Sequence, residues 1–297
     1  WLVDGGMHAV AQGVAALARK SGATIRTNAG VARIETNSGR VSGVILETGE
    51  RLACDAAVFA GDTAALSEGL LGPDAAPAAP AVPSHLRSLS AVTWCLDAET
   101  SGFDLLRHNV FFSRDYGAEF DALHAGRLPP EPTVYVCAQD RGDVPGAHAG
   151  QERVLVLVNA PPRGHDLSPM DIETCEQRTF RSLERCGLTI RTDPAGAIRT
   201  APGDFARLFP GSRGAIYGRA SHGWASSFTR PGSKSAVPGL WLAGGGVHPG
   251  AGVPMATLSG MLCAQAIATA RASTRRFRPA AMAGGISTPS ATTAPTV

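Results

Sequence analysis

The sequence is poor in aromatic and charged residues. Phe, Trp and Tyr together make up 6% of its 297 residues, and Asp, Glu, Lys and Arg make up 18%. With so few aromatic rings, a stacking platform for single-stranded nucleic acid is not expected. The formal net charge is only +2, and basic residues are dispersed among acidic ones, so the charge pattern indicates no nucleic-acid partner.

Cysteine is also scarce and widely spaced. The six cysteines form no CxxC pair, which argues against a disulfide framework and against a zinc site. We therefore expect reduced thiols, most of them packed, in a cytoplasmic protein. The chain starts at Trp1 without a visible signal peptide, and we expect it to be a piece of something longer.

Several motifs with well-understood chemistry are missing. No GxGxxG follows a strand, no GxxxxGK[ST] is present, and neither HExxH nor a persuasive Ser/His/Asp spacing occurs. Residues 235–270 lack acidic and basic side chains, but glycines and prolines interrupt the first half of this stretch. Only the run after Pro254 can be helical, and we expect it to be too short to cross a membrane.

Hydrophobic periodicity indicates an α/β unit near the start of the chain. A helix that ends at Gly22 is predicted after Gly5-Gly6, with one apolar face formed by Val10, Val14, Leu17 and Ala18. Strand-like segments follow at residues 23–27, 31–36, 40–47 and 51–61. The last two are predicted to form a hairpin at Thr48-Gly49.

The middle of the chain has a different character and predicts a mixed α+β unit. Residues 71–84 are rich in Pro and Ala and indicate a connector. Strand-like runs follow at 89–98, 109–113, 133–140 and 153–161. A helix is predicted from an N-cap at Ser168, with Pro169 first, Asp171 three residues after the cap, and a buried stripe of Ile172, Cys175, Thr179, Leu183 and Cys186. Residues 271–297 are expected to form a disordered tail.

The segment GGGVHPGAGVPMATLSG, residues 244–260, combines a flexible loop with the start of a helix. A short apolar strand precedes it at 239–245, and Pro254 suits the first turn of the helix. Unpaired N–H groups and the positive end of the helix dipole favour an electron-rich ligand. A phosphate or the pyrimidine edge of a reduced flavin would fit, and a tight structural turn without a ligand is the alternative.

The residues of this segment carry a family resemblance. PGLWLAGGGVHPGAGVP, from Pro238 to Pro254, resembles the C-terminal flavin motif of the phytoene desaturase family of carotenoid desaturases. Residues 200–235 and 5–36 resemble further segments of that family, so the resemblance covers about residues 1–270. The segment with His222-Gly223-Trp224, Phe228 and Arg230-Pro231 is more similar to the branch that acts on hydroxylated or methoxylated neurosporene in purple phototrophic bacteria.

The resemblance implies the C-terminal portion of a two-domain, Rossmann-like FAD-binding flavoprotein, without the N-terminal GxGxxG unit. It divides the chain into a partial FAD-binding domain (1–62), a mixed α+β substrate domain (63–235), a flavin-binding segment (236–270) and the tail (271–297). It also implies that the backbone of Val31 contacts the adenine. The flavin-ring contacts are expected at Gly244, Gly245, Gly246, His248, Gly250, Gly252, Val253, Pro254 and Met255.

The reaction implied by the resemblance is desaturation of an acyclic carotenoid. Because the carbons that lose hydrogen are unactivated, the flavin serves as the electron sink and the protein supplies orientation and a dry channel. No acid–base constellation is needed, and the residues identify neither a catalytic side chain nor an electron acceptor. His248 either lies beside the flavin or shapes the loop. His222 and Trp224 either line the substrate entrance or pack under a long loop.

A carotenoid must be collected from a bilayer, so the resemblance also implies peripheral association with the inner or intracytoplasmic membrane through an apolar patch of the middle section. The arginines of the tail either touch anionic headgroups or are solvated; these are Arg271, Arg275, Arg276 and Arg278. Two rival functions stay open. One is a flavoprotein of the amine oxidase or retinol saturase type, and the other is a flavin-free carotenoid or lipid carrier.

Overall fold

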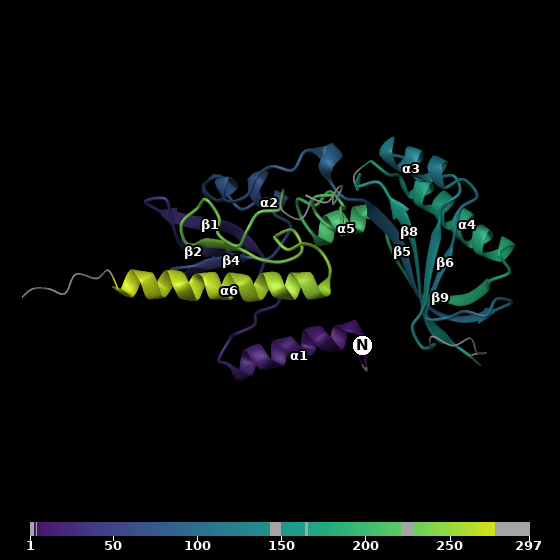
Figure 1. Cartoon of the computed structure of the whole chain (residues 1–297), viewed down its shortest axis with the longest axis horizontal. Coiled ribbons are helices and arrows are strands. Elements are labelled where there is room, and N and C mark those ends of the chain that lie inside the picture. The colour runs from purple at the N-terminus through teal and green to yellow at the C-terminus, as the bar shows by residue number, and fades with distance from the viewer. Residues whose placement is uncertain (1–2, 4, 143–149, 164–165, 221–228, 277–297) are drawn as a thin grey trace, which may run out of the picture.

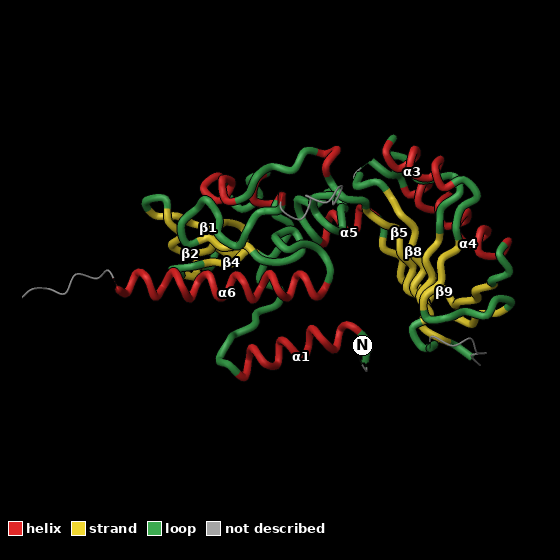
Figure 2. The backbone as a smooth tube through the Cα atoms, in the orientation of Figure 1, coloured by secondary structure: helices red, strands yellow, loops and turns green. Residues whose placement is uncertain are grey.

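The chain folds into two lobes joined side by side (Figure 1). The structure is a computed structural model, and it describes residues 3, 5–142, 150–163, 166–220 and 229–276. One lobe contains the first strands of the chain together with its last strand and last helix. The other lobe is built from a single larger sheet and the helices packed on it (Figure 2).

Two small sheets form the first lobe. Strands β1 (Val31–Asn37), β2 (Arg40–Leu46) and β3 (Arg51–Ala53) form an antiparallel sheet, and the predicted turn at Thr48-Gly49 joins β2 to β3. Strand β4 (Ala57–Phe59) leaves this meander and pairs in parallel with β10 (Leu240–Leu242). The predicted segment 51–61 is therefore two strands in different sheets.

The prediction of a strand at residues 23–27 is wrong. No strand lies between Lys20 and Val31, a stretch that the structure describes throughout. Instead, Arg26 forms an exposed ion pair with Glu50, with 2.7 Å between Nη2 and Oε2. The segment has the alternating pattern of a strand, but without a neighbouring strand its backbone groups have no ladder to join.

Helices α1 (Met7–Lys20) and α6 (Val253–Arg276) lie below these sheets in Figure 1. The predicted range of α1 is confirmed, but its apolar face is not buried. Val14 is 59% exposed and Leu17 is 66% exposed, and α1 has no buried residue. The periodicity predicted the helix correctly, because apolar residues repeated at helical spacing form one continuous face. The same periodicity does not tell whether other residues of the described chain pack on that face.

Helix α6 is longer than the sequence suggested. By length and composition it is the one helix of the described residues able to cross a membrane, over the 20 residues Val253–Ala272, and little of this stretch is buried. The expectation that this run is too short is therefore wrong, because the helix starts at Val253 and continues through Arg276. The buried Ser259 and Cys263 mark the face by which α6 packs on β10. The predicted disordered tail starts too early, because residues 271–276 belong to α6, and residues 277–297 lie outside the described part.

The Pro/Ala-rich connector is packed rather than exposed. It contains the 3-10 helix η1 (Pro73–Ala78), and a second short turn, η2 (Ser84–Leu86), follows. Ala75 is fully buried and Ala78 is 4% exposed, in the same core cluster as Leu66 of helix α2 (Ala64–Ser67). Small alanine side chains let the segment approach the first lobe closely, so composition alone was misleading here.

The second lobe is a five-stranded antiparallel sheet in the order β6-β7-β8-β5-β9. The four predicted strand-like runs are confirmed, and a fifth strand, β9, was not predicted. The five strands of this sheet are β5 (Ser90–Ser101), β6 (His108–Phe111), β7 (Val134–Ala138), β8 (Glu152–Ala160) and β9 (Thr189–Thr200).

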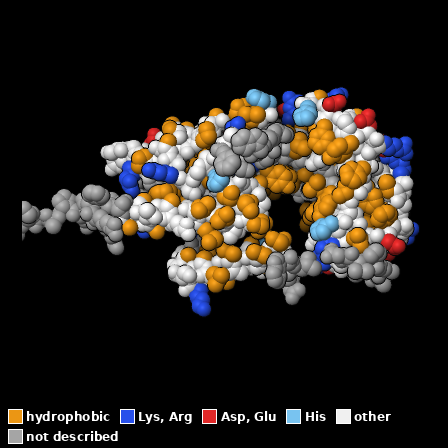
Figure 3. Space-filling model, in the orientation of Figure 1, with side chains coloured by type: hydrophobic (Ala, Val, Ile, Leu, Met, Phe, Trp, Pro, Cys, Tyr) orange, Lys and Arg blue, Asp and Glu red, His pale blue; other side chains and the backbone are white. Residues whose placement is uncertain are grey.

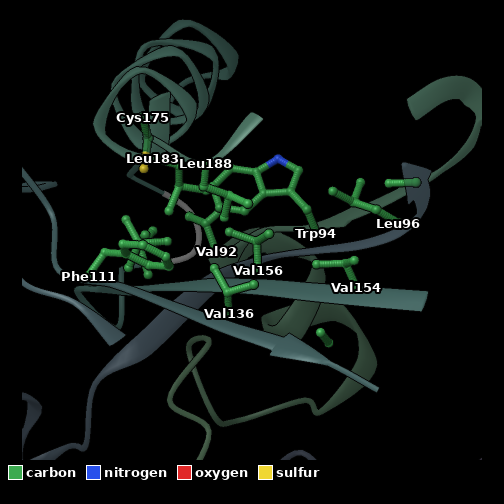
Figure 4. Packing of buried hydrophobic residues seen from close by; sticks show 14 of the residues in the cluster. Val92, Trp94, Leu96, Phe111, Val136, Val154, Val156, Cys175, Leu183 and Leu188 are labelled. Atoms are coloured by element: carbon green, nitrogen blue, oxygen red, sulfur yellow. The ribbon is translucent and has the colours of Figure 1, made fainter. Parts of the chain in front are cut away.

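One face of this sheet carries the main hydrophobic core, shown in Figure 4. Helix α4 (Pro169–Arg185) covers it, and Trp94 meets Phe180 edge-on at 5.6 Å between ring centroids. The predicted N-cap is confirmed, since the Ser168 side chain accepts from the Asp171 N–H and Asp171 bonds back to Ser168. Cys186 was wrongly placed in the buried stripe; it follows the helix and is exposed.

Two further helices complete this lobe and its junction with the first. Helix α3 (Tyr116–His124) is capped by Asp115, whose side chain accepts from the Ala118 N–H at 2.9 Å. Helix α5 (Pro202–Leu208) contacts β5 near the point where the two lobes meet. Beyond α5 the chain returns to the first lobe and ends in β10 and α6, which sets the glycine-rich segment against β4.

Candidate functional site

The candidate site begins where β4 and β10 end. Because the two strands run parallel, their carboxyl ends open at the same edge. Gly61-Asp62 continues β4, and Gly244-Gly245 continues β10. The Ala243 N–H donates to the Phe59 carbonyl at 3.0 Å, so the two ends stay in register. A Cβ on Gly244 would lie 3.0 Å from the Ala60 carbonyl oxygen, so this close approach requires glycine.

The glycine loop, residues 244–252, is held by three of its backbone amides. The Gly244 N–H donates to Ser259 Oγ of α6 at 3.2 Å, and the Val247 N–H donates to the Gly244 carbonyl at 3.1 Å. The His248 N–H donates to the Pro231 carbonyl at 2.9 Å, and the peptide bond between His248 and Pro249 is cis. The loop is therefore tied to α6, to itself and to the segment that precedes β10.

Other amides of the glycine loop are open. Within the described part of the chain, five of its N–H groups meet no acceptor: those of Gly245, Gly246, Gly250, Ala251 and Gly252. The first turn of α6 adds further unpaired N–H groups and the positive end of its dipole. Gly252 has φ +102°, and a Cβ at this position would meet nothing within 4 Å, so its side faces open space. Several converging donors of this kind suit an anionic or electron-rich ligand edge.

The structure gathers most of the predicted cofactor contacts into this one place. Residues from Gly244 to Met255 form the loop and the first turn of α6, and Val253, Pro254 and Met255 are exposed there. His248 is half-buried within the loop. Val31 lies apart, at the start of β1 and opposite Leu46, and no described contact joins it to the loop. His222 and Trp224 lie outside the described residues.

Arg230 is a neighbour of the loop to which the sequence assigned no role in the site. It is 6% exposed, and its guanidinium donates to the carbonyls of Tyr217, Arg219 and Gly245. Burial lowers the pKa of Arg230 from its ordinary value, the Arg219 charge lowers it further, and Asp62 opposes the shift. An arginine stays protonated under such a shift, so a buried positive charge lies next to the loop.

The second lobe faces the same region with an apolar sheet surface. On the side of the sheet opposite the α4 core, Leu155 and Leu157 of β8 are half-buried. Leu155 lies in register between Cys95 of β5 and Cys137 of β7. Leu157 lies in register between Thr93 of β5 and Tyr135 of β7. Figure 3 shows hydrophobic side chains around the hollow between the lobes. The leucines of this face offer an apolar surface to a long apolar molecule, and the exposed Arg153 lies on the same face of β8.

Comparisons with known proteins identify relatives of this chain. The chain is 50% identical to a hydroxyneurosporene desaturase of Rubrivivax gelatinosus, with 99% of the chain and 56% of that protein covered. It is 47% identical to a hydroxyneurosporene desaturase of Cereibacter sphaeroides, with 93% and 55% covered. Among solved structures, an oxidoreductase from Methanosarcina mazei matches at 16% identity and a TM-score of 0.48, with 86% of the chain and 54% of that structure covered.

The chain spans about half the length of the curated relatives that it matches. The resemblance drawn from the PGLWLAGGGVHPGAGVP segment is confirmed by these desaturases. Residues 1–268 match the family described as flavin containing amine oxidoreductase, which covers both lobes, the glycine loop and most of α6. The chain belongs to the flavin containing amine oxidoreductase family.

Proposed function

We propose that this chain is the C-terminal part of an FAD-dependent desaturase of acyclic carotenoids, with hydroxyneurosporene or a methoxylated counterpart as substrate. The observation that carries the proposal is the glycine loop with its open amides, in a chain 50% identical to a hydroxyneurosporene desaturase. The loop suits a flavin ring, because the N–H groups of Gly245, Gly246 and Gly252 have no described acceptor and, being glycines, these residues carry no side chain that covers them.

The chemistry that FAD supplies when bound is acceptance of a hydride from the polyene. The Gly245 and Gly246 amides would hold the pyrimidine edge of the ring, and the start of α6 would favour the negative charge that arises there on reduction. The backbone of Val31 would contact the adenine. The remaining site residues orient substrate and exclude water, which lets the reaction proceed without an acid–base pair.

The apolar sheet surface with Leu155 and Leu157 is the proposed wall of the polyene channel. Leu155 and Leu157 offer dispersion contacts along the strands, and the charge on this face lies at its end, where Arg153 pairs with Asp140. His222 and Trp224 are proposed to line the entrance to this channel. We assign the tyrosine of this surface, Tyr135, a packing role beside His108, with 2.7 Å between Oη and Nδ1.

The same proposal includes peripheral attachment to the cytoplasmic face of an inner or intracytoplasmic membrane, where carotenoids dissolve. An aromatic stripe on and before α3 supports it: Phe112 is 68% exposed and Tyr116 is 52% exposed. Tyr116 also meets Phe120 edge-on at 5.0 Å, which makes the stripe continuous along the helix. Aromatic side chains of this kind insert at the interfacial depth of a bilayer. The buried Ser259 of α6 holds the glycine loop, and this packing favours a place for α6 within the first lobe over a membrane span.

The experiment that tests the function uses the full-length protein with its natural upstream sequence. We expect flavin absorption bands after purification with FAD, and a red shift of acyclic carotenoid spectra as conjugation lengthens. Absence of flavin at saturating FAD, with carotenoid still bound, would identify a carrier. Flavin without any action on carotenoids but with amine turnover would identify an enzyme of the amine oxidase type.

The membrane part has its own test. Flotation of the full-length protein with liposomes of bacterial lipid should fall several-fold in the double variant F112S/Y116S, because two exposed aromatic rings are removed. The matched control is M170S, since Met170 is 67% exposed at the start of α4 and away from the stripe. Equal flotation of all three proteins would contradict the assignment of the stripe.

A further inference from the structure

The buried arginine beside the glycine loop joins three segments of the chain. Arg230 Nη1 donates to the Gly245 carbonyl at 2.9 Å and to the Tyr217 carbonyl at 3.1 Å. Arg230 Nη2 donates to the Arg219 carbonyl at 2.7 Å. Two glycines make room for the side chain: a Cβ on Gly250 would lie 3.4 Å from Nε, and a Cβ on Gly218 would lie 3.9 Å from Nη1.

The bond to the Gly245 carbonyl determines where the next amide points. The peptide between Gly245 and Gly246 is trans, so its C=O and N–H point in opposite directions in one plane. With the carbonyl directed at Arg230, the Gly246 N–H is directed away from the guanidinium. This N–H has no acceptor within the described residues, and Gly246 is half-buried rather than freely exposed.

The same bond changes the strength of that amide as a donor. The Arg230 guanidinium is a cation that donates to the Gly245 carbonyl, and this bond polarises the whole peptide group. The N–H of a polarised peptide is a stronger donor than the N–H of an isolated one. A peptide whose carbonyl is held by a buried guanidinium also has less freedom to rotate. Glycine on both sides would otherwise leave the Gly245–Gly246 peptide the most mobile part of the loop.

We propose that Arg230 is a positioning residue that fixes the Gly245–Gly246 peptide so that the Gly246 N–H faces the pyrimidine edge of the flavin. This inference rests on the proposed function. Because negative charge develops on that edge when the flavin is reduced, an aimed and polarised N–H with a cation behind it binds the reduced form more tightly than the oxidised form. Arg230 therefore raises the reduction potential of the flavin.

A purely structural arginine would tie the same segments together without this consequence. The chain offers a matched control for that case. Arg87 is 7% exposed, donates to the Gly211 carbonyl at 2.7 Å and pairs with Glu68 at 2.7 Å, and it makes no described contact with the glycine loop. It is a second buried arginine that ties loops together through a backbone carbonyl.

The test compares full-length wild type with R230Q, R230K and R87Q. The readouts are thermal unfolding, FAD affinity, and the two-electron midpoint potential of the bound flavin measured against a reference dye. In R230Q we expect at least a tenfold loss of preference for the reduced flavin, which lowers the midpoint by about 30 mV. In R87Q we expect a lower melting temperature with an unchanged midpoint.

R230K keeps the positive charge but changes the hydrogen-bond geometry, so it separates the two effects. It also tests the proposal if R230Q does not fold. Lysine keeps the cation but lacks the planar fork that reaches three carbonyls, so FAD affinity should fall about tenfold while the midpoint stays near that of wild type. A wild-type midpoint in R230Q, or R230K indistinguishable from wild type in affinity, would overturn the proposal. Wild type without flavin would instead overturn the proposed function, so the two failures are distinct.

Discussion

Ser259 is the residue through which helix α6 holds the glycine loop. It is fully buried, and its Oγ accepts the Gly244 N–H at 3.2 Å. In S259A that N–H loses its acceptor inside the protein, so the free energy of unfolding should fall by about 1–3 kcal/mol. Urea denaturation measures this. The control is T257V, since the exposed Thr257 bonds only to the Val253 carbonyl of its own helix, and a change there as large as in S259A would contradict the prediction.

The six cysteines should differ sharply in reactivity, although all are free thiols. Burial raises the pKa of Cys175 to about 11, so at pH 8 almost none of it is thiolate, and burial raises the pKa of Cys263 in the same direction. Iodoacetamide should therefore modify the exposed Cys95 and Cys186 first. Peptide mass spectrometry checks the order, and modification of Cys175 as fast as Cys186 in the folded protein would contradict it.

At the scale of single residues, the sequence indicated the local backbone conformation better than it indicated which residues surround a side chain. The dense glycine pattern indicated an open backbone loop correctly because glycine is required at the close approach of Gly244 to Ala60. Arg230 could not be recognised, since nothing in the neighbouring residues distinguishes a buried arginine from an exposed one. Its burial depends on Tyr217 and Gly245, which only the fold brings together.

Among the elements, α4 carries the clearest prediction of stability. Leu183 is 1% exposed and packs in the core of the second lobe. L183A removes three buried heavy atoms and leaves a cavity, so unfolding should become easier by about 2–5 kcal/mol. M170A on the same helix should change stability by less than about 0.5 kcal/mol, because Met170 is 67% exposed. Comparable urea midpoints for the two variants would show that α4 is not part of the core.

The elements that the sequence predicted share strong local signals, and the missed ones have conflicting signals. The capping residues and apolar stripe of α4 agree with each other, and so do the alternating runs of β5, β7 and β8. Strand β9 contains Asp193-Pro194-Ala195-Gly196, which is typical of a turn, and its pairing with β5 indeed shifts register there before it resumes. The local turn residues argue against a strand here, but tertiary pairing on both sides outweighs them.

At the scale of the whole molecule, the two lobes present different halves of one proposed task. The first lobe offers backbone donors at the ends of β4 and β10, and the second offers an apolar sheet surface. The sequence predicted this division from the change in composition near residue 71, because strands of a half-buried sheet and a glycine-rich strand–loop–helix have different patterns. The exposed faces of α1 and α6 were not foreseen, since periodicity does not report what covers a helix.

Those exposed faces lead to the last prediction, which concerns the chain by itself. Val14 and Leu17 of α1 and Met261 of α6 are each more than half exposed, and the chain spans about half the length of its relatives. The glycine loop would supply the proposed flavin-ring contacts, but a dinucleotide also needs donors for its pyrophosphate. Residues 1–297 alone should therefore bind FAD at least a hundredfold more weakly than the full-length protein, and should bind the apolar dye ANS more strongly.

Flavin fluorescence titration and ANS emission measure both effects on one preparation. The R87Q variant of the full-length protein serves as a control, because it is destabilised without losing any part of the proposed flavin site. If residues 1–297 alone bound FAD tightly and in equal stoichiometry, the loop and α6 would suffice for the cofactor. Pyrophosphate contacts from elsewhere would then be unnecessary, and the apolar faces of α1 and α6 would need another explanation, such as contact with a bilayer.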